Sequence, residues 1–149
     1  MYASIVTGTD GSPTANAAMA QAFELARRCS ATVHVVSVCR PLTAMVAAGA
    51  PEASALVAMA VSSKDQEVAA LRTFLDETCA GADCRDLTVV PHLLEGDPSE
   101  GILKIAEQEK ADLIVVGNRG MHGARRVLGS VPNTISHRAR CSVLIVQTT

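Results

Sequence analysis

The chain has 149 residues, of which 48% are apolar and only 2% are aromatic. That length favours one domain, and the apolar content is enough for a core of aliphatic side chains, as in α/β proteins with buried parallel strands. The formal net charge of −2 excludes general nucleic-acid binding, which depends on an excess of Lys and Arg.

The charges are distributed unevenly along the chain. The part from Gly117 to Thr149 holds five arginines and no acidic residue, whereas the first 116 residues hold the other eight basic residues and all fifteen acidic ones. The two parts therefore carry charges of +5 and −7. The basic C-terminal part is a candidate local anion site.

Cysteine usage and hydropathy predict a cytoplasmic protein. Five cysteines, an odd number, are scattered without any C-x-x-C pair, so we expect reduced thiols and no zinc site among them. The N-terminus lacks the basic region and cleavage site of a signal peptide. The Ala-rich stretch 44–61 is interrupted by Gly49, Pro51 and Glu52 and falls short of the roughly 20 apolar residues that a spanning helix needs. We expect no membrane role.

Apolar periodicity predicts strands that alternate with helices. The predicted strands are residues 3–7, 32–38, 87–94, 112–116 and 142–146. The predicted helices are residues 15–29, 63–79, a helix that begins after the N-cap Asp97, and a helix over about 133–139. Glu100, three residues after Asp97, is expected to complete a capping box. Residues 40–63 indicate a loop that carries part of a helix.

This alternation predicts an α/β fold, with one doubly wound, five-stranded, mostly parallel sheet and helices on both faces. Pro91 favours an edge position for the third strand. In such sheets ligands bind beyond the carboxyl ends of the strands, where the strand order reverses. The loops after strands one and four, residues 8–12 and 117–130, are expected to meet there.

The segment from Gly117 to Ser130 is the main candidate for a phosphate-binding loop. It joins a predicted buried strand to a helix start, where backbone N–H groups and the helix dipole favour an anion. Alternatively, its glycines permit only a tight turn and close packing. It is neither a Walker A loop nor the dinucleotide fingerprint, which follows the first strand. Ser130 either caps the helix or donates to a phosphate.

Asp10 ends the first predicted strand. A carboxylate at this position suits ribose hydroxyls or a magnesium ion. Asp-Gly is also a common turn pair, so a purely structural role stands beside the functional one.

The histidines give weaker signals. They are His34, His92, His122 and His137. None shows metal-ligand spacing, and only His122, in the glycine loop, is a candidate phosphate contact. The others are expected to be core or surface residues. No Ser-His-Asp set or carboxylate pair can be assembled, so we predict no dedicated catalysis.

Four motifs in order resemble the universal stress protein family over essentially the whole chain. They are Ile5–Ser12, Gly96-Asp97-Pro98, the loop Gly117-x-x-Gly120 with Gly129-Ser130 after it, and Ser142–Val146. The Gly-Asn-x-Gly start and the Gly-Ser-Val-Pro continuation are most similar to actinobacterial members. The nucleotide-binding branch has nine residues between the second glycine and the Gly-Ser pair, and this chain has eight. We expect the shortening to be absorbed in the middle of the loop.

The resemblance implies a Rossmann-like fold of the adenine nucleotide alpha hydrolase type that binds ATP, AMP or cyclic AMP, with magnesium as a candidate partner of Asp10. Thr9 and Asp10 would flank adenine and ribose, and Val38 would pack on adenine. The nucleotide-binding residues that it implies are Gly8, Thr9, Asp10, Val38, Gly117, Asn118, Arg119, Gly120, Met121, Gly123, Gly129, Ser130 and Val131.

The resemblance further implies a homodimer and a role as a cytoplasmic stress-response sensor or nucleotide sink. The dimer would form through the last strand, whose apolar edge needs cover. Its residues are Val143, Leu144, Ile145 and Val146. The alternatives are a slow ATPase or self-phosphorylating enzyme, for which no base is evident, and an interaction module without nucleotide. The branch without nucleotide tends to lose the glycine loop, which this chain has. Residues 41–62 are expected to cover the base.

Overall fold

The computed structural model describes residues 1–39, 65–66, 68–77, 86–118 and 128–147. The expected cover at 41–62 and the middle of the glycine loop lie outside these residues. Within them the strands are β1 (Ser4–Thr9), β2 (Thr32–Cys39), β3 (Val89–Glu95), β4 (Leu113–Gly117) and β5 (Ser142–Val146). The helices are α1 (Pro13–Cys29), α4 (Pro98–Gln108) and α5 (Ser130–Arg138), and residues 68–77 are also helical.

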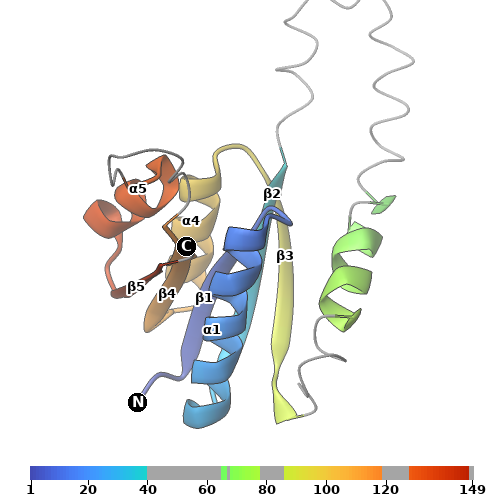
Figure 1. Cartoon of the computed structure of the whole chain (residues 1–149), viewed down its shortest axis with the longest axis horizontal. Coiled ribbons are helices and arrows are strands. Elements are labelled where there is room, and N and C mark those ends of the chain that lie inside the picture. Colours follow the sequence, from blue (N-terminus) through green and yellow to red (C-terminus); the bar gives the residue numbers. More distant parts are fainter. Residues whose placement is uncertain (40–64, 67, 78–85, 119–127, 148–149) are drawn as a thin grey trace, which may run out of the picture.

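The strands form one sheet in the order β3-β2-β1-β4-β5, and every pairing is parallel. The chain moves outward from β1 to β3 and then returns to the other side of β1 with β4 and β5 (Figure 1). The order therefore reverses between β1 and β4. This confirms the predicted doubly wound fold and the edge position of the strand that contains Pro91.

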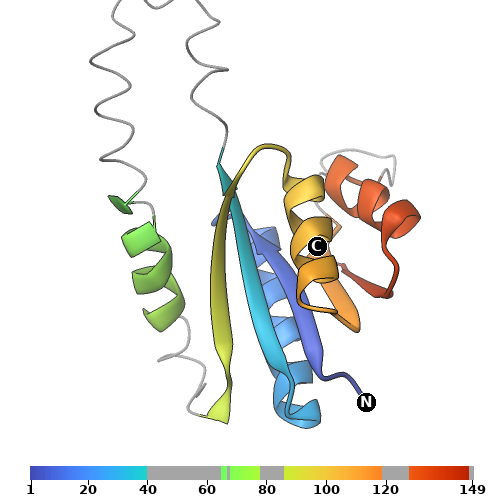
Figure 2. The same ribbon diagram turned by 180° about the vertical axis from the view of Figure 1, so that it is seen from behind.

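Helices cover both faces of the sheet and create two cores. Figures 1 and 2 show α1 on one face and α4 with α5 on the other. Successive residues of a strand point to opposite faces, so Ile5 belongs to the core under α1 and Val6 to the core under α4. Leu75, from the helical residues 68–77, also belongs to the core under α1.

Local signals fix where the helices begin. The Ser12 side chain accepts a hydrogen bond from Ala15 N at 3.3 Å and caps α1, with Pro13 at the first helical position. Asp97 caps α4 by accepting from the amides of Ser99 and Glu100, at 2.9 and 3.1 Å.

Two expectations about helix starts need correction. A Glu three residues after the N-cap completes a capping box when it reaches back to the cap, but the Glu100 carboxylate instead binds the guanidinium of Arg138 on α5. The last helix begins at Ser130, three residues before its predicted start. The pairing of Glu100 with Arg138 joins α4 to the end of α5, a contact that neither segment predicts alone.

The amino-terminal end of the sheet is closed by hydrogen bonds. The Asp112 carboxylate accepts from the amides of Ala3 and Ser4, at 2.7 and 3.0 Å. These two bonds hold the pKa of Asp112 below its usual value. The Asp112 main chain joins Ser4 on one side and Ser142 on the other, so one residue connects three strand starts.

Among the described residues, no helix combines the length and the apolar character that crossing a bilayer requires.

Candidate functional site

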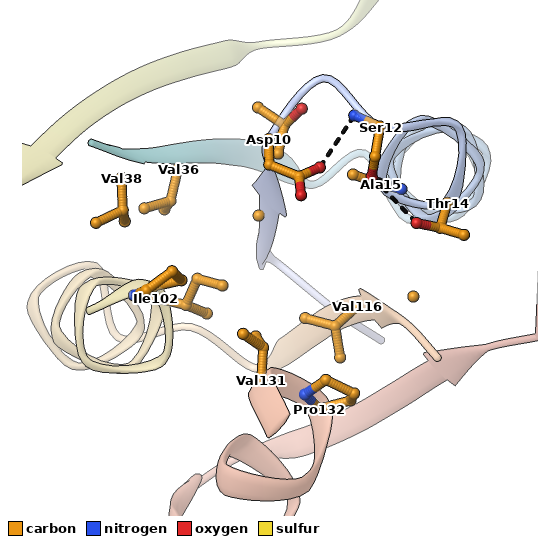
Figure 3. A pocket seen from close by; sticks show the side chains of 14 residues that line it. Asp10, Ser12, Thr14, Ala15, Val36, Val38, Ile102, Val116, Val131 and Pro132 are labelled. Atoms are coloured by element: carbon orange, nitrogen blue, oxygen red, sulfur yellow. Dashed lines mark hydrogen bonds between the residues drawn. The ribbon is translucent and has the colours of Figure 1, made fainter. Parts of the chain in front are cut away.

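A cleft lies beyond the carboxyl ends of β1 and β4, where the strand order reverses. Its cavity volume is about 120 Å³ as the described residues form it, and the cleft is open to solvent. Figure 3 shows its walls. They are built by Gly8, Thr9, Asp10, Ser12, Thr14, Ala15, Val36, Val38, Pro98, Ile102, Val116, Gly117, Val131 and Pro132.

The β1–α1 turn forms the polar side of the cleft. Asp10 accepts a hydrogen bond from Ser12 N at 3.0 Å, and Thr9 Oγ1 accepts one from Gly11 N at 3.2 Å. Gly11 has a φ of +74°, a conformation that suits glycine. The Asp-Gly pair is therefore a true turn, as its structural interpretation predicts. The bond from Ser12 N therefore orients the Asp10 carboxylate at the edge of the cleft.

The opposite wall is apolar. Val36 and Val38 lie two residues apart on β2 and share the face under α4, where Ile102 packs beside them (Figure 3). A Cβ at Gly8 would lie 2.6 Å from Ile102 Cδ1. Glycine at this position therefore lets α4 approach β1 closely and leaves the β1 main chain exposed at the cleft.

Gly117 ends β4 where that strand meets the start of α1. A Cβ there would lie 2.9 Å from the carbonyl oxygen of Thr14, a main-chain atom that has little freedom to move. The absence of a side chain thus has a structural reason, which is one of the two alternatives that the sequence leaves open. A contact between Gly117 and a phosphate stays a prediction.

The start of α5 contributes a third side. Gly129 is the N-cap residue, and no side chain of the described residues caps the helix. Ser130 is the first helical residue, so its interpretation as the cap is wrong. The first amides of a helix have no intrahelical acceptor and carry the positive end of the dipole. Val131 and Pro132 line the cleft, so this helix end adjoins it.

The structure brings part of the predicted nucleotide site together. The predicted residues that line the cleft are Gly8, Thr9, Asp10, Val38, Gly117 and Val131. Asn118, Gly129 and Ser130 are described but are not part of its lining. The amide of Asn118 donates to Val146 O at 2.9 Å. Arg119, Gly120, Met121, His122 and Gly123 lie outside the described residues.

Several lining residues escaped the sequence analysis, although signals for them exist. Val36 is two positions before Val38, so strand alternation predicts that both side chains face the same way. Pro98 and Ile102 lie in the first turns of α4, whose start follows a strand end. A helix that begins at the carboxyl edge of a parallel sheet points its first turns at the ligand side.

The basic C-terminal part is less available to an anion than its charge suggests. Arg138 binds Glu100, and Arg140 binds Glu107 at 3.0 Å. Both arginines therefore pair with α4 at the surface, and the Glu100 carboxylate raises the pKa of Arg138 further. The other three arginines of this part lie outside the described residues.

The parallel sheet and its cleft define a doubly wound α/β domain with an open cleft at the reversal of strand order. The family model described as "Universal stress protein family" matches residues 1–147. The chain therefore belongs to the universal stress protein family, which confirms the resemblance of its motifs.

Individual relatives agree with this assignment. Universal stress protein MJ0531 of Methanocaldococcus jannaschii is 32% identical over 150 residues, which cover 99% of this chain and 83% of the relative. A crystal structure of a universal stress protein in complex with cAMP is 29% identical, with a TM-score of 0.68 over 99% of this chain and 98% of the other. UspA from Lactobacillus plantarum has a TM-score of 0.74 at 24% identity over 97% of both chains, which supports the fold.

Proposed function

We propose that this chain binds an adenine nucleotide in the cleft between β1 and β4 and acts as a stress-response sensor or nucleotide sink in the cytoplasm. The observation that carries the proposal is the arrangement of the cleft. Its apolar wall faces a carboxylate and adjoins a helix start, and these three surfaces match the three parts of a nucleotide.

Each part of the nucleotide has a chemically suitable partner. The flat, largely apolar adenine fits beside Val36, Val38 and Ile102. The ribose hydroxyls suit the Asp10 carboxylate, and the phosphates suit the uncapped N-terminus of α5. Several hydrogen bonds at a net of about 1 kcal/mol each, stronger where a charge takes part, support micromolar binding after the cost of association.

A relative supports the choice of ligand. The solved universal stress protein in complex with cAMP covers nearly all of this chain at 29% identity. The proposal for this chain extends to ATP and AMP, because the adenine and ribose contacts are common to all three. Magnesium beside Asp10 belongs to the same proposal when the ligand is ATP.

Calorimetric titration with ATP and cyclic AMP tests the site. Asp10→Asn removes the charge that faces ribose and is expected to weaken binding roughly tenfold, or by about 1.4 kcal/mol. Ser130→Ala is expected to weaken ATP more than cyclic AMP, because it removes a phosphate donor. Asp86→Asn is the matched control, since Asp86 is exposed near the amino-terminal end of β3.

Unchanged affinity in both Asp10→Asn and Ser130→Ala would contradict this cleft as the site. Mass spectrometry of small molecules released from the denatured, purified protein identifies the bound nucleotide directly. The ATP titration is then repeated with a chelator present, in the wild type and in Asp10→Asn. The change in ATP affinity measures the contribution of magnesium.

We further propose that β5 is the surface of a homodimer. The strand pairs with β4 on one side only, and Leu144 is 36% exposed while its neighbours Val143 and Ile145 are half-buried. Leu144→Glu places a charge on this apolar edge and is expected to shift the protein from dimer to monomer in sedimentation velocity. Ala20→Glu, on the exposed side of α1, is the control. A dimer that persists in Leu144→Glu contradicts the β5 interface.

A further inference from the structure

Two histidines meet on the face of the sheet that α4 covers. His34 lies on β2 and His92 on β3, and the strand register pairs His34 with Val90 and Val36 with His92. The two histidines are therefore diagonal neighbours on the same face of adjacent strands. Their rings face each other, with His34 Nδ1 3.0 Å from His92 Nε2.

A carboxylate adjoins the histidine pair. Glu109 follows the last turn of α4, and its Oε2 lies 4.0 Å from His34 Nε2. One ligand atom from each of His34, His92 and Glu109 lies within 4.8 Å of the others. The three residues come from three separate elements, so only the folded chain assembles them.

The three residues lie at a partly open position. His34 is only 6% exposed, whereas the Glu109 side chain is 39% exposed and connects the group to solvent. An ion could therefore reach the group from the side of Glu109.

We propose that His34, His92 and Glu109 form a binding site for a divalent transition-metal ion of the zinc type. Two imidazole nitrogens and one carboxylate oxygen are a ligand set that zinc takes, with a fourth position left for water. Zn–N bonds of about 2.0–2.1 Å in a tetrahedron place two nitrogens about 3.3 Å apart. The observed 3.0 Å between His34 and His92 therefore needs only a small rotation of the rings.

The chemistry and position separate this site from the cleft. Nitrogen ligands favour zinc and its transition-metal neighbours over magnesium, which prefers oxygen. The helix α4 has 11 residues, a length of about 16 Å, and its first turn lines the cleft while Glu109 follows its last turn. Figure 2 shows α4 running along the sheet from one strand end towards the other. The metal site therefore lies apart from the cleft, at the other end of α4.

A bound ion would join three elements that otherwise meet through weaker contacts. β3 is an outer strand of the sheet, and the ion would connect it to β2 and to the end of α4. Because zinc binds the folded chain, we expect the melting temperature of the wild type to rise with zinc concentration.

The test is a zinc titration of the full-length, reduced and nucleotide-free protein by calorimetry, with melting curves in parallel. His92→Gln and Glu109→Gln each remove one ligand and are expected to weaken zinc binding roughly tenfold or more. Glutamine retains hydrogen-bonding groups at position 92, so the variant keeps a partner for His34, and circular dichroism of the metal-free variants checks their fold. His137→Gln, an exposed histidine on α5, is the matched control.

Cobalt absorption and histidine NMR identify the ligands. The proposal predicts a cobalt spectrum without thiolate charge transfer, together with zinc-dependent shifts of the His34 and His92 ring signals. Zinc affinity unchanged in both His92→Gln and Glu109→Gln would overturn the proposal. So would a thiolate-dominated cobalt spectrum with both histidine ring signals unmoved, because binding would then belong to the cysteines.

Discussion

The two ends of the sheet use their polar groups differently. At the amino-terminal end, Asp112 binds two main-chain amides and joins the starts of three strands. At the carboxyl-terminal end, β4 stops at Gly117, a cleft opens, and no side chain among the described residues caps the start of α5. The polar groups of the first end hold strands together, whereas those of the second end lie in a turn and a helix start beside an open cleft.

This difference predicts that mutations at the two ends should affect different properties, namely stability and ligand affinity. Changes at the closed end alter stability and leave the cleft intact. Changes at the open end alter ligand affinity, and they alter stability only where the cleft wall is also a packing contact. Gly117 and Ser12 are such dual positions, and Asp112 belongs to the closed end alone.

The largest loss of stability is expected for Gly117→Val. Its side chain would press on the Thr14 carbonyl, which a Cβ alone approaches to 2.9 Å. We expect a loss of about 1–3 kcal/mol in the free energy of unfolding, together with weaker nucleotide binding. Urea denaturation measures the first and calorimetry the second.

Ala20→Val is the control for Gly117→Val, because it adds a branched side chain at an exposed site of α1 and changes only helix propensity. If Gly117→Val melts like the wild type, the approach of β4 to α1 relaxes easily and Gly117 has no packing role.

A middle effect is expected for Ser12→Ala. The change removes the side-chain oxygen that accepts a hydrogen bond from Ala15 N. We therefore expect the free energy of unfolding to fall by about 1 kcal/mol. Ser136→Ala is the matched control, because that hydroxyl donates to a carbonyl inside α5 and caps no helix start. Equal losses in the two variants would show that the Ser12 cap contributes nothing of its own.

The smallest effect is expected for Asp112→Asn, and it should depend on pH. The bonds from Ala3 and Ser4 lower the folded-state pKa of Asp112 below its usual value of 3.8. A carboxyl with a depressed pKa stabilises the fold above its unfolded-state value, and that contribution is lost as the pH falls through the folded-state pKa.

The stability gap between wild type and Asp112→Asn should therefore be present at neutral pH and disappear in strong acid. Melting curves across this range measure it, with Asp86→Asn as the exposed control. Nucleotide affinity should stay unchanged. A gap that persists in strong acid would show that the charge of Asp112 does not cause it.

Most of the fold could be predicted from the sequence because its signals are local. Ser12-Pro13 and Asp97-Pro98 mark helix starts, and short β-branched runs mark strands. These signals predict the order of the helices and strands, and that order predicts a parallel sheet. The bounds of β5 were predicted correctly, and Pro91 correctly indicated an edge strand. The orientation of Glu100 was predicted wrongly because its partner, Arg138, lies on a different helix. The start of α5 was predicted three residues late.

The candidate site was only partly predictable. Asp10, Val38 and Gly117 follow strand ends, and the topology rule brings strand ends together. The histidine pair was missed because the search for metal ligands considered spacing along the chain. His34 and His92 are 58 residues apart and meet only through the register of β2 with β3.

Pro91 affects which edge of the sheet can accept a further strand. Val33 N donates to Thr88 O, so the alternation of a parallel ladder turns Pro91 to the outer side of β3. A proline there offers no N–H to an incoming strand. A strand of another chain would therefore find a missing donor at β3. In the homodimer proposed above, chains would pair through β5 and would not extend at β3, which would form closed pairs and not unlimited fibres.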